Sequence, residues 1–128
     1  MEYSRKVNLK PIDPEKVRIE MVQGSKDTYA IIFELDSLPD NTWTRFFYDS
    51  LGKDMRIAEA IINGANITVL TSADDIKKKV DWTTKLVDYT NQQVEIHNKN
   101  VEEKHEEARR RKAKGEEDIK KMRELLKQ

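Results

Sequence analysis

Two histidines are the side chains in this chain whose type and spacing come closest to supporting chemistry. His97 and His105 are eight residues apart, about two helical turns, so they cannot share one metal ion directly. Glu102 lies three residues before His105, the spacing of a Glu and a His that bind iron in carboxylate-bridged di-iron bundles. Such a site needs two of these motifs and two further glutamates, and this sequence has one motif in a very polar stretch. We therefore interpret His105 as a solvated histidine among charge pairs and predict no metal and no cofactor.

A second candidate is a cluster of cations near the C-terminus, because clustered basic side chains can bind phosphates. The cluster consists of Arg109, Arg110, Arg111 and Lys112. Acidic residues border it on both sides, and acidic and basic residues three or four positions apart on a helix pair with each other. Lys+Arg and Asp+Glu both number 24, so no net charge draws the chain to a polyanion. Nucleic-acid binding through this cluster is therefore the alternative interpretation and not the preferred one.

For catalysis, no residues stand at a useful spacing. The chain has no cysteine, which excludes disulfides, thiolate metal ligands and cysteine nucleophiles. It has no Gly-x-Ser-x-Gly motif, no glycine-rich phosphate loop and no zinc-finger spacing. Residues 1–72 contain no histidine. We expect a protein that is not an enzyme.

The first element expected to position any site is an antiparallel hairpin. Apolar and polar residues alternate in residues 17–21 and 29–35, and the turn between these segments contains Gly24, so the pattern predicts two paired strands. The first of them should be half-buried, with an inward face made of Val17, Ile19 and Met21. Before the hairpin, residues 7–12 form a short strand or an extended arm that Pro11 and Pro14 end.

A helix and a second hairpin follow. Residues 37–41 are rich in helix-capping types, and the apolar residues behind them share one helical face that we expect to be core: Trp43, Phe46, Phe47 and Leu51. Tyr48 lies off this face and is expected to be more exposed, and Gly52 should end the helix. Asn63-Gly64 is the preferred central pair of a two-residue hairpin turn, so residues 56–62 and 66–70 are predicted to be strands.

Residues 73–128 have a different composition. They contain no proline and one glycine, and half of them are charged, which predicts a long helix that starts near Ser72. The predicted fold is therefore α+β, with a small antiparallel sheet of four to five strands and a long C-terminal helix. We expect residues 1–72 to form the α+β head and residues 73–128 a helical arm. Residues 73–101 of this arm should pack on the head, and residues 102–128 should be mostly solvated.

The long helix is apolar along two lines. The first line, in which valines recur every seven residues, comprises Ile76, Val80, Val87, Val94 and Val101. The second lies roughly opposite and comprises Trp82, Leu86, Tyr89 and Ile96. A helix that is apolar on two faces needs two partners. One face is predicted to cover the sheet, and the other to contact the aromatic-rich helix, the N-terminal segment or a second copy of the protein.

Gly115 divides the last part of the helix. Cations precede it and anions follow it, which is what the end of one helix and the start of the next prefer, so we predict a bend here. The alternative is one continuous helix, because a single glycine costs only about 1 kcal/mol relative to alanine. After the glycine, a short amphipathic stretch presents Ile119, Met122, Leu125 and Leu126.

These patterns favour a non-catalytic protein–protein interaction or assembly module, such as an accessory or structural protein that docks a larger complex. It should self-associate through the C-terminal helix, with a dimer favoured, although threonine, histidine and basic residues beside the valine line exclude a regular leucine zipper. The residues expected to contact a partner are Trp82, Leu86, Tyr89, Val94, Ile96, Val101, Ile119, Met122 and Leu126. No apolar run is long enough to span a membrane, and the absence of cysteine fits a cytoplasmic protein.

Overall fold

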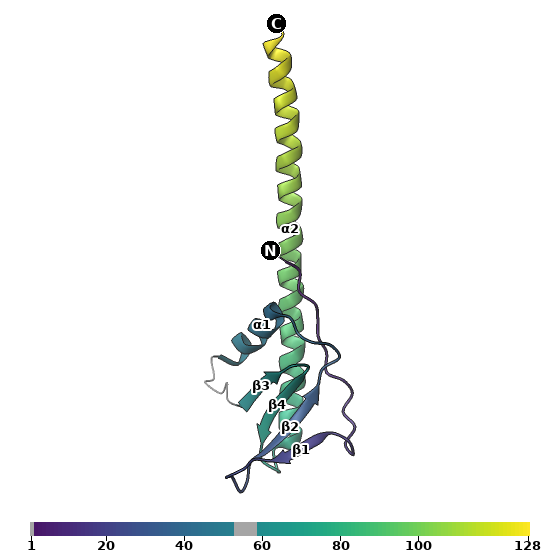
Figure 1. Ribbon diagram of the computed structural model, residues 1–128, viewed down its shortest axis with the longest axis vertical. Coiled ribbons are helices and arrows are strands. Elements are labelled where there is room, and N and C mark those ends of the chain that lie inside the picture. The colour runs from purple at the N-terminus through teal and green to yellow at the C-terminus, as the bar shows by residue number, and fades with distance from the viewer. Residues whose placement is uncertain (1, 53–58) are drawn as a thin grey trace. The chain divides into compact units, whose positions relative to one another are not determined.

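A computed structural model describes residues 2–52 and 59–128 and has the predicted α+β fold (Figure 1). A four-stranded antiparallel sheet is combined with one short helix between two hairpins and with one long C-terminal helix. The elements in chain order are β1 (Arg18–Met21), β2 (Tyr29–Glu34), α1 (Asn41–Leu51), β3 (Ala60–Asn63), β4 (Asn66–Thr71) and α2 (Ile76–Leu126). By their internal contacts, the residues group into two units, Ser4–Glu95 and Met1–Tyr3 with Ile96–Gln128.

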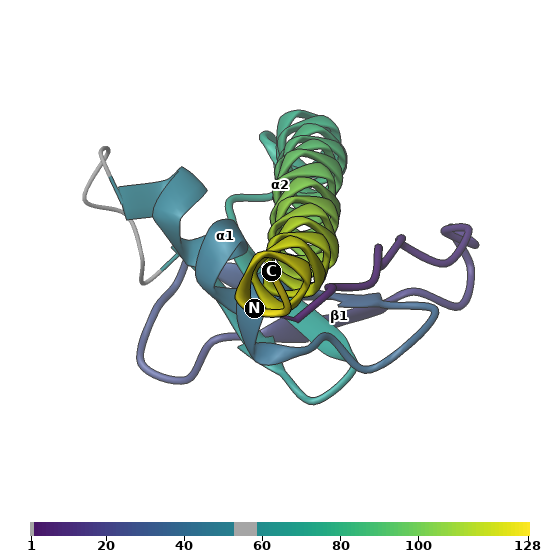
Figure 2. The same cartoon turned by 90° about the horizontal axis from the view of Figure 1, so that it is seen from above.

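The sheet has the strand order β1-β2-β4-β3, so both hairpins pair within one sheet. Ile31 of β2 is opposite Val69 of β4, which is opposite Ala60 of β3. These three residues are buried on one face. Of the three, Ile31 belongs to the apolar set whose alternation predicted β2. Figure 2 shows α1 and α2 on the same side of the sheet, and they cover this face.

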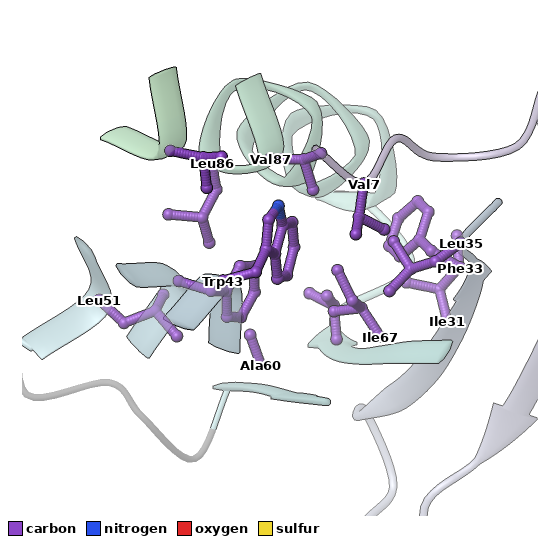
Figure 3. Close-up of a cluster of buried hydrophobic side chains, with 13 residues drawn as sticks. Val7, Ile31, Phe33, Leu35, Trp43, Leu51, Ala60, Ile67, Leu86 and Val87 are labelled. Carbon is purple, nitrogen blue, oxygen red and sulfur yellow. The ribbon is translucent and has the colours of Figure 1, made fainter. Parts of the chain in front are cut away.

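Trp43 is the largest fully buried side chain. Its ring stacks on Phe47 at 5.5 Å between centroids, which places two of the three predicted core aromatics of α1 in one stack. The third, Phe46, is half-buried against the cluster. Figure 3 shows the indole in the middle of the cluster, with its nitrogen turned towards α2. A buried indole N–H needs an acceptor, and α2 supplies it.

The acceptor is Asn91, a buried polar residue of α2. Its Oδ1 accepts hydrogen bonds from Trp43 Nε1 at 2.8 Å and from the backbone N–H of Val7 at 3.0 Å. Its Nδ2 donates to the carbonyl oxygen of Val7 at 2.9 Å and to Oδ1 of Asn8 at 3.0 Å. One amide therefore joins the N-terminal segment, α1 and α2, and uses all of its hydrogen-bonding groups.

The N-terminal segment is an extended arm with one bridging pair, Leu9 opposite Leu35. This was one of the two forms predicted for residues 7–12. The backbone N–H of Lys10 donates to the carbonyl oxygen of Glu34 at 2.8 Å, and Val7 is fully buried. The arm is thus held partly by backbone bonds to the end of β2 and partly by Asn91.

Asp40 caps α1 and also binds the N-terminal segment. Its carboxylate accepts from the backbone N–H of Trp43 at 2.8 Å, from the hydroxyl of Ser4 at 2.9 Å and from the N–H of Arg5 at 3.2 Å. Partial burial by itself raises the pKa of Asp40, but the hydrogen bonds from Trp43, Arg5, Ser4 and Thr42 outweigh it and leave the pKa below its usual value. The ionised carboxylate is therefore the form that the fold stabilises.

The expectation that β1 is half-buried was wrong. All four of its residues are exposed, including Ile19 and Met21. The strand lies at the edge of the sheet and pairs only with β2, whereas the buried cluster draws its strand residues from β2, β3 and β4. Alternation thus identified a strand but not its place in the sheet. Val17, just before the strand, is half-buried against the cluster.

Two details of the head also differ from expectation. Asn63 pairs with Asn66, so the two central residues of the second turn are Gly64 and Ala65 and not Asn63 and Gly64. Gly64 has the positive φ of this turn, at 60°. The register sets Ile62 opposite Ile67, so two large apolar side chains pair across the strands. Of the strand predicted for residues 56–62, residues 56–58 lie outside the described residues.

Tyr48 is half-buried rather than the exposed member of the aromatic group. Its hydroxyl oxygen accepts a hydrogen bond from the backbone N–H of Ile62 at 2.8 Å, and its ring meets Phe47 edge-on. The Tyr48 side chain therefore links α1 to β3. Its position around the helix axis, off the Trp43 and Phe47 face, did not indicate this contact.

The long helix differs from expectation at two points. It begins at Ile76 because residues 72–75 form a turn, in which the N–H of Asp75 donates to the carbonyl oxygen of Ser72. It also continues through Gly115, so the predicted bend was wrong and the alternative was right. Ion pairs four residues apart support the helix on both sides of the glycine, from Arg111 to Glu107 and from Lys121 to Glu117.

We predict that Asn91→Ala strongly destabilises the fold. The substitution removes the acceptor of the Trp43 indole and of the Val7 N–H, and each buried donor left without a partner costs about 1–3 kcal/mol. The free energy of unfolding can be measured in urea by tryptophan fluorescence. Gln92→Ala, at the exposed neighbouring position, is the control and should change it little. Equal values for the two variants would contradict the role of Asn91.

We predict that the stability difference between wild type and Asp40→Asn narrows in acid. Asparagine remains a good cap but does not ionise. Because the folded pKa of Asp40 is lowered, its carboxylate stabilises the fold above the unfolded value of about 3.9 and loses this effect as the pH falls through the folded pKa. Urea titrations from neutral pH downwards test this, and a difference that stays constant through the acid range would show that the expectation is incorrect.

We predict that Gly115→Ala strengthens α2. A methyl group at this position would meet no atom within 4 Å, so alanine adds helix propensity of about 1 kcal/mol without a clash. The reciprocal control, Ala113→Gly, should weaken the helix by a similar amount. Thermal loss of the helical circular dichroism signal measures both effects at one protein concentration. Loss of helix in Gly115→Ala would indicate a bend that needs glycine.

Candidate interaction surface

The first apolar line of α2 is largely covered. Val87 and Val94 belong to the core of the unit Ser4–Glu95, and Val80 packs against that core. Thr83 and Thr90, which occupy the neighbouring positions, are fully buried, and their hydroxyls donate to backbone carbonyls of the preceding helical turn. The threonines that exclude a leucine zipper are thus accommodated inside a core.

The second apolar line divides in two. Leu86 is buried in the core, and Trp82 is half-buried with Nζ of Lys79 5.0 Å from its ring centroid. Tyr89 and Ile96, further along the same line, are both about half exposed. The structure therefore does not bring the second line together as one surface.

A pocket of about 250 Å³ lies beside Trp82 and is also lined by Leu86, Ser50, Leu51, Glu59, Lys78 and Lys79. Nζ of Lys79 is 2.8 Å from Oε2 of Glu59, so these two charges in the pocket neutralise each other. Among residues 2–52 and 59–128, no buried side-chain nitrogen or oxygen lacks a hydrogen-bond partner.

The histidines contact the N-terminus of the same chain. Nε2 of His97 lies 2.8 Å from the carbonyl oxygen of Glu2, and the ring of His105 meets Tyr3 edge-on at 5.7 Å. The Tyr3 hydroxyl donates to Glu102, and this bond lowers the pKa of Glu102 and raises that of Tyr3. In the described part of the chain, no three His, Asp or Glu side chains gather closely enough to hold a metal ion. The Glu102-x-x-His105 motif thus holds an aromatic side chain.

Three arginines of the basic cluster form ion pairs with glutamates of the same helix. Arg111 pairs with Glu107 at 2.9 Å and Arg110 with Glu106 at 3.6 Å, and Arg109 lies 3.4 Å from Glu102. Lys112 is exposed. The expected pairing of cations with neighbouring acids is therefore present, at surface positions where each pair contributes at most about 1 kcal/mol.

The largest gathering of exposed apolar side chains on α2 lies at its C-terminal end. From residue 102 to the end of the chain every side chain is exposed, apart from the half-buried Gly115. We call the four apolar residues near the end the terminal patch; their exposed fractions are 48% for Ile119, 54% for Met122, 68% for Leu125 and 86% for Leu126. Isolated exposed apolar residues are ordinary, but four within eight positions of one helix indicate a contact surface.

The residues predicted to bind a partner thus fall into different settings. Leu86, Val94 and Val101 are buried within the chain, and Trp82 is half-buried. Tyr89, Ile96, Ile119, Met122 and Leu126 are exposed. Sequence reasoning missed two residues, Tyr3 and Asn91. Asn91 carries a signal, since it lies between Val87 and Val94 on the covered face, but Tyr3 carries none.

Comparisons with protein-family models, with curated proteins and with solved structures give no match to the chain. Within the described residues, no helix is both long enough and apolar enough to span a lipid bilayer.

Proposed function

We propose that the protein is a non-catalytic interaction module that self-associates through the C-terminal part of α2. The terminal patch is the contact surface, and the protein docks a larger assembly through its long C-terminal helix. The observation that carries the proposal is the exposure of Ile119, Met122, Leu125 and Leu126 on a helix that is otherwise highly charged.

The energetics support contact with a protein. Burying a Leu, Ile or Met side chain is worth about 1.5–3 kcal/mol, and the terminal patch has four such residues, with exposed fractions between 48% and 86%. The six exposed apolar residues of α2 do not contribute equally, because Tyr89 and Ile96 stand apart from the patch. The remaining charged positions of the helix keep the surrounding surface hydrated and confine the contact to the patch.

The alternative, nucleic-acid binding through Arg109, Arg110, Arg111 and Lys112, has less support. The three arginines lie within 4 Å of glutamate carboxylates of the same helix. A nucleic acid would have to displace these acids or bind beside them, and like charge opposes both. We therefore keep the protein partner as the proposal.

We predict that Met122→Ser with Leu126→Ser weakens self-association, because the double variant removes two apolar side chains from the patch. Sedimentation velocity over a series of concentrations up to tens of micromolar measures the effect. Leu38→Ser is a matched control. The exposed fraction of Leu38, 65%, is similar to the 68% of Leu125, but Leu38 lies before α1 and outside the terminal patch. Wild type and control should associate alike, and the double variant should stay monomeric.

Two results would oppose the proposal. A wild-type protein that remains a monomer throughout the concentration series rules out self-association at these concentrations. A double variant that associates as strongly as wild type places the contact elsewhere on the molecule.

A further inference from the structure

We propose that a second copy of this chain binds antiparallel along residues 101–126 of α2, with the terminal patch of each copy beside Tyr3 and His105 of the other. The inference rests on the proposed self-association and adds its direction and register. It follows from the order of charges along one face of the helix.

One stripe of α2 provides the contact face. Alternating steps of four and three residues, the spacing of a two-helix seam, connect His105, Ala108, Lys112, Gly115, Ile119, Met122 and Leu126. Val101, four residues before His105, is buried within its own chain. At 100° per residue these positions lie within about 100° of one another. The stripe continues the spacing of Val87 and Val94, which are packed against a core within the same chain.

Next to Gly115 the charges beside the stripe change sign, with Arg109 and Arg111 before the glycine and Glu116 and Asp118 after it. An antiparallel copy centred between Lys112 and Gly115 sets the cations of one helix against the anions of the other. Each facing pair occurs twice in such a dimer, and the pairs are Glu102 with Arg123, Arg109 with Glu116, and Arg111 with Asp118. All of them are attractive, which is how charges beside a helical seam select orientation.

Three of these charges are available for the second copy. Glu116, Asp118 and Arg123 are exposed and form no ion pair with any described residue of their own chain. Their neighbours Glu117 and Lys121 pair with each other along the helix, at 4.0 Å. In the antiparallel arrangement each of these three residues faces a residue of opposite charge on the second copy.

A parallel, in-register dimer fits less well. It would bring Lys112 of the two copies together on the seam and would set Lys104 beside Arg109 of the other copy. Both contacts are repulsive, and they offset the two attractive pairs that the parallel register would form, Arg111 with Glu116 and Asp118 with Arg123. In the antiparallel register Lys112 instead faces Gly115 of the second copy, where no side chain opposes it.

The apolar residues also match in the antiparallel register. Met122 of one copy reaches the level of His105 of the other, and Leu126 reaches the level of Val101. Tyr3 lies against His105 and Glu102, and its side chain is 51% exposed, so its ring offers apolar surface at this level. Ile119 faces Ala108. The terminal patch thus meets the exposed aromatic residue held by the Glu102-x-x-His105 motif.

Single cysteines test the direction, because the chain has no cysteine of its own. Ala108→Cys and Ile119→Cys are prepared separately, one with a tag that changes its mass, then mixed and oxidised. We expect a disulfide between the two variants as the main product and little disulfide within either variant alone. Glu103→Cys, on the opposite side of the helix, is the control and should not cross-link to Ile119→Cys.

The outcomes separate this inference from the proposed function. Cross-linking of Ile119→Cys to itself shows a parallel dimer and overturns the inference while self-association stands. Sedimentation that shows dimers, with no preference for the mixed disulfide, overturns the register. A monomer in sedimentation overturns both. Sedimentation of the reduced cysteine variants checks that each still associates, and circular dichroism checks that each remains helical.

Discussion

The side-chain amide of Asn91 is the interaction on which the fold of Ser4–Glu95 depends. A primary amide has two donors and one oxygen with two lone pairs, and here all four are used. The groups that it binds come from the N-terminal segment and from α1, so one side chain sets their position on α2. Apolar packing around Trp43 supplies most of the stabilisation, but packing is not directional. The amide selects one arrangement among many that would bury similar area.

Local patterns were enough to predict most of the fold. The alternation in residues 29–35 identified β2 and its buried face, and the valine repeat identified the covered face of α2. Features that depend on competition between elements were not predictable in this way. β1 has the alternation of a half-buried strand, but it lies at a sheet edge that the helices do not cover. Gly115 has the flanking charges of a helix end, but its small intrinsic cost is offset by ion pairs on either side.

The candidate surface was predictable in part for the same reason. Periodicity shows that Leu86, Val94, Ile119 and Met122 lie on apolar lines of a helix, but only the fold shows that the first two are covered. Tyr3 and its contact with Glu102 span 99 positions in sequence, and no local pattern encodes a contact of that separation. The order of charges around Gly115 can, by contrast, be read directly from the sequence, since Arg109 and Arg111 precede the glycine and Glu116 and Asp118 follow it.

The sequence separation of the Asn91 contacts affects when the fold can form. Asn91 lies 84 residues after Val7 and 48 residues after Trp43. During translation the N-terminal part emerges first, and the two hairpins can pair while α2 is still being synthesised. Until residue 91 has left the ribosome, the Trp43 indole and the Val7 backbone N–H have no acceptor within the chain and bind water instead. The hydrogen bonds that join α2 to the N-terminal segment and to α1 can therefore form only after both hairpins have been synthesised.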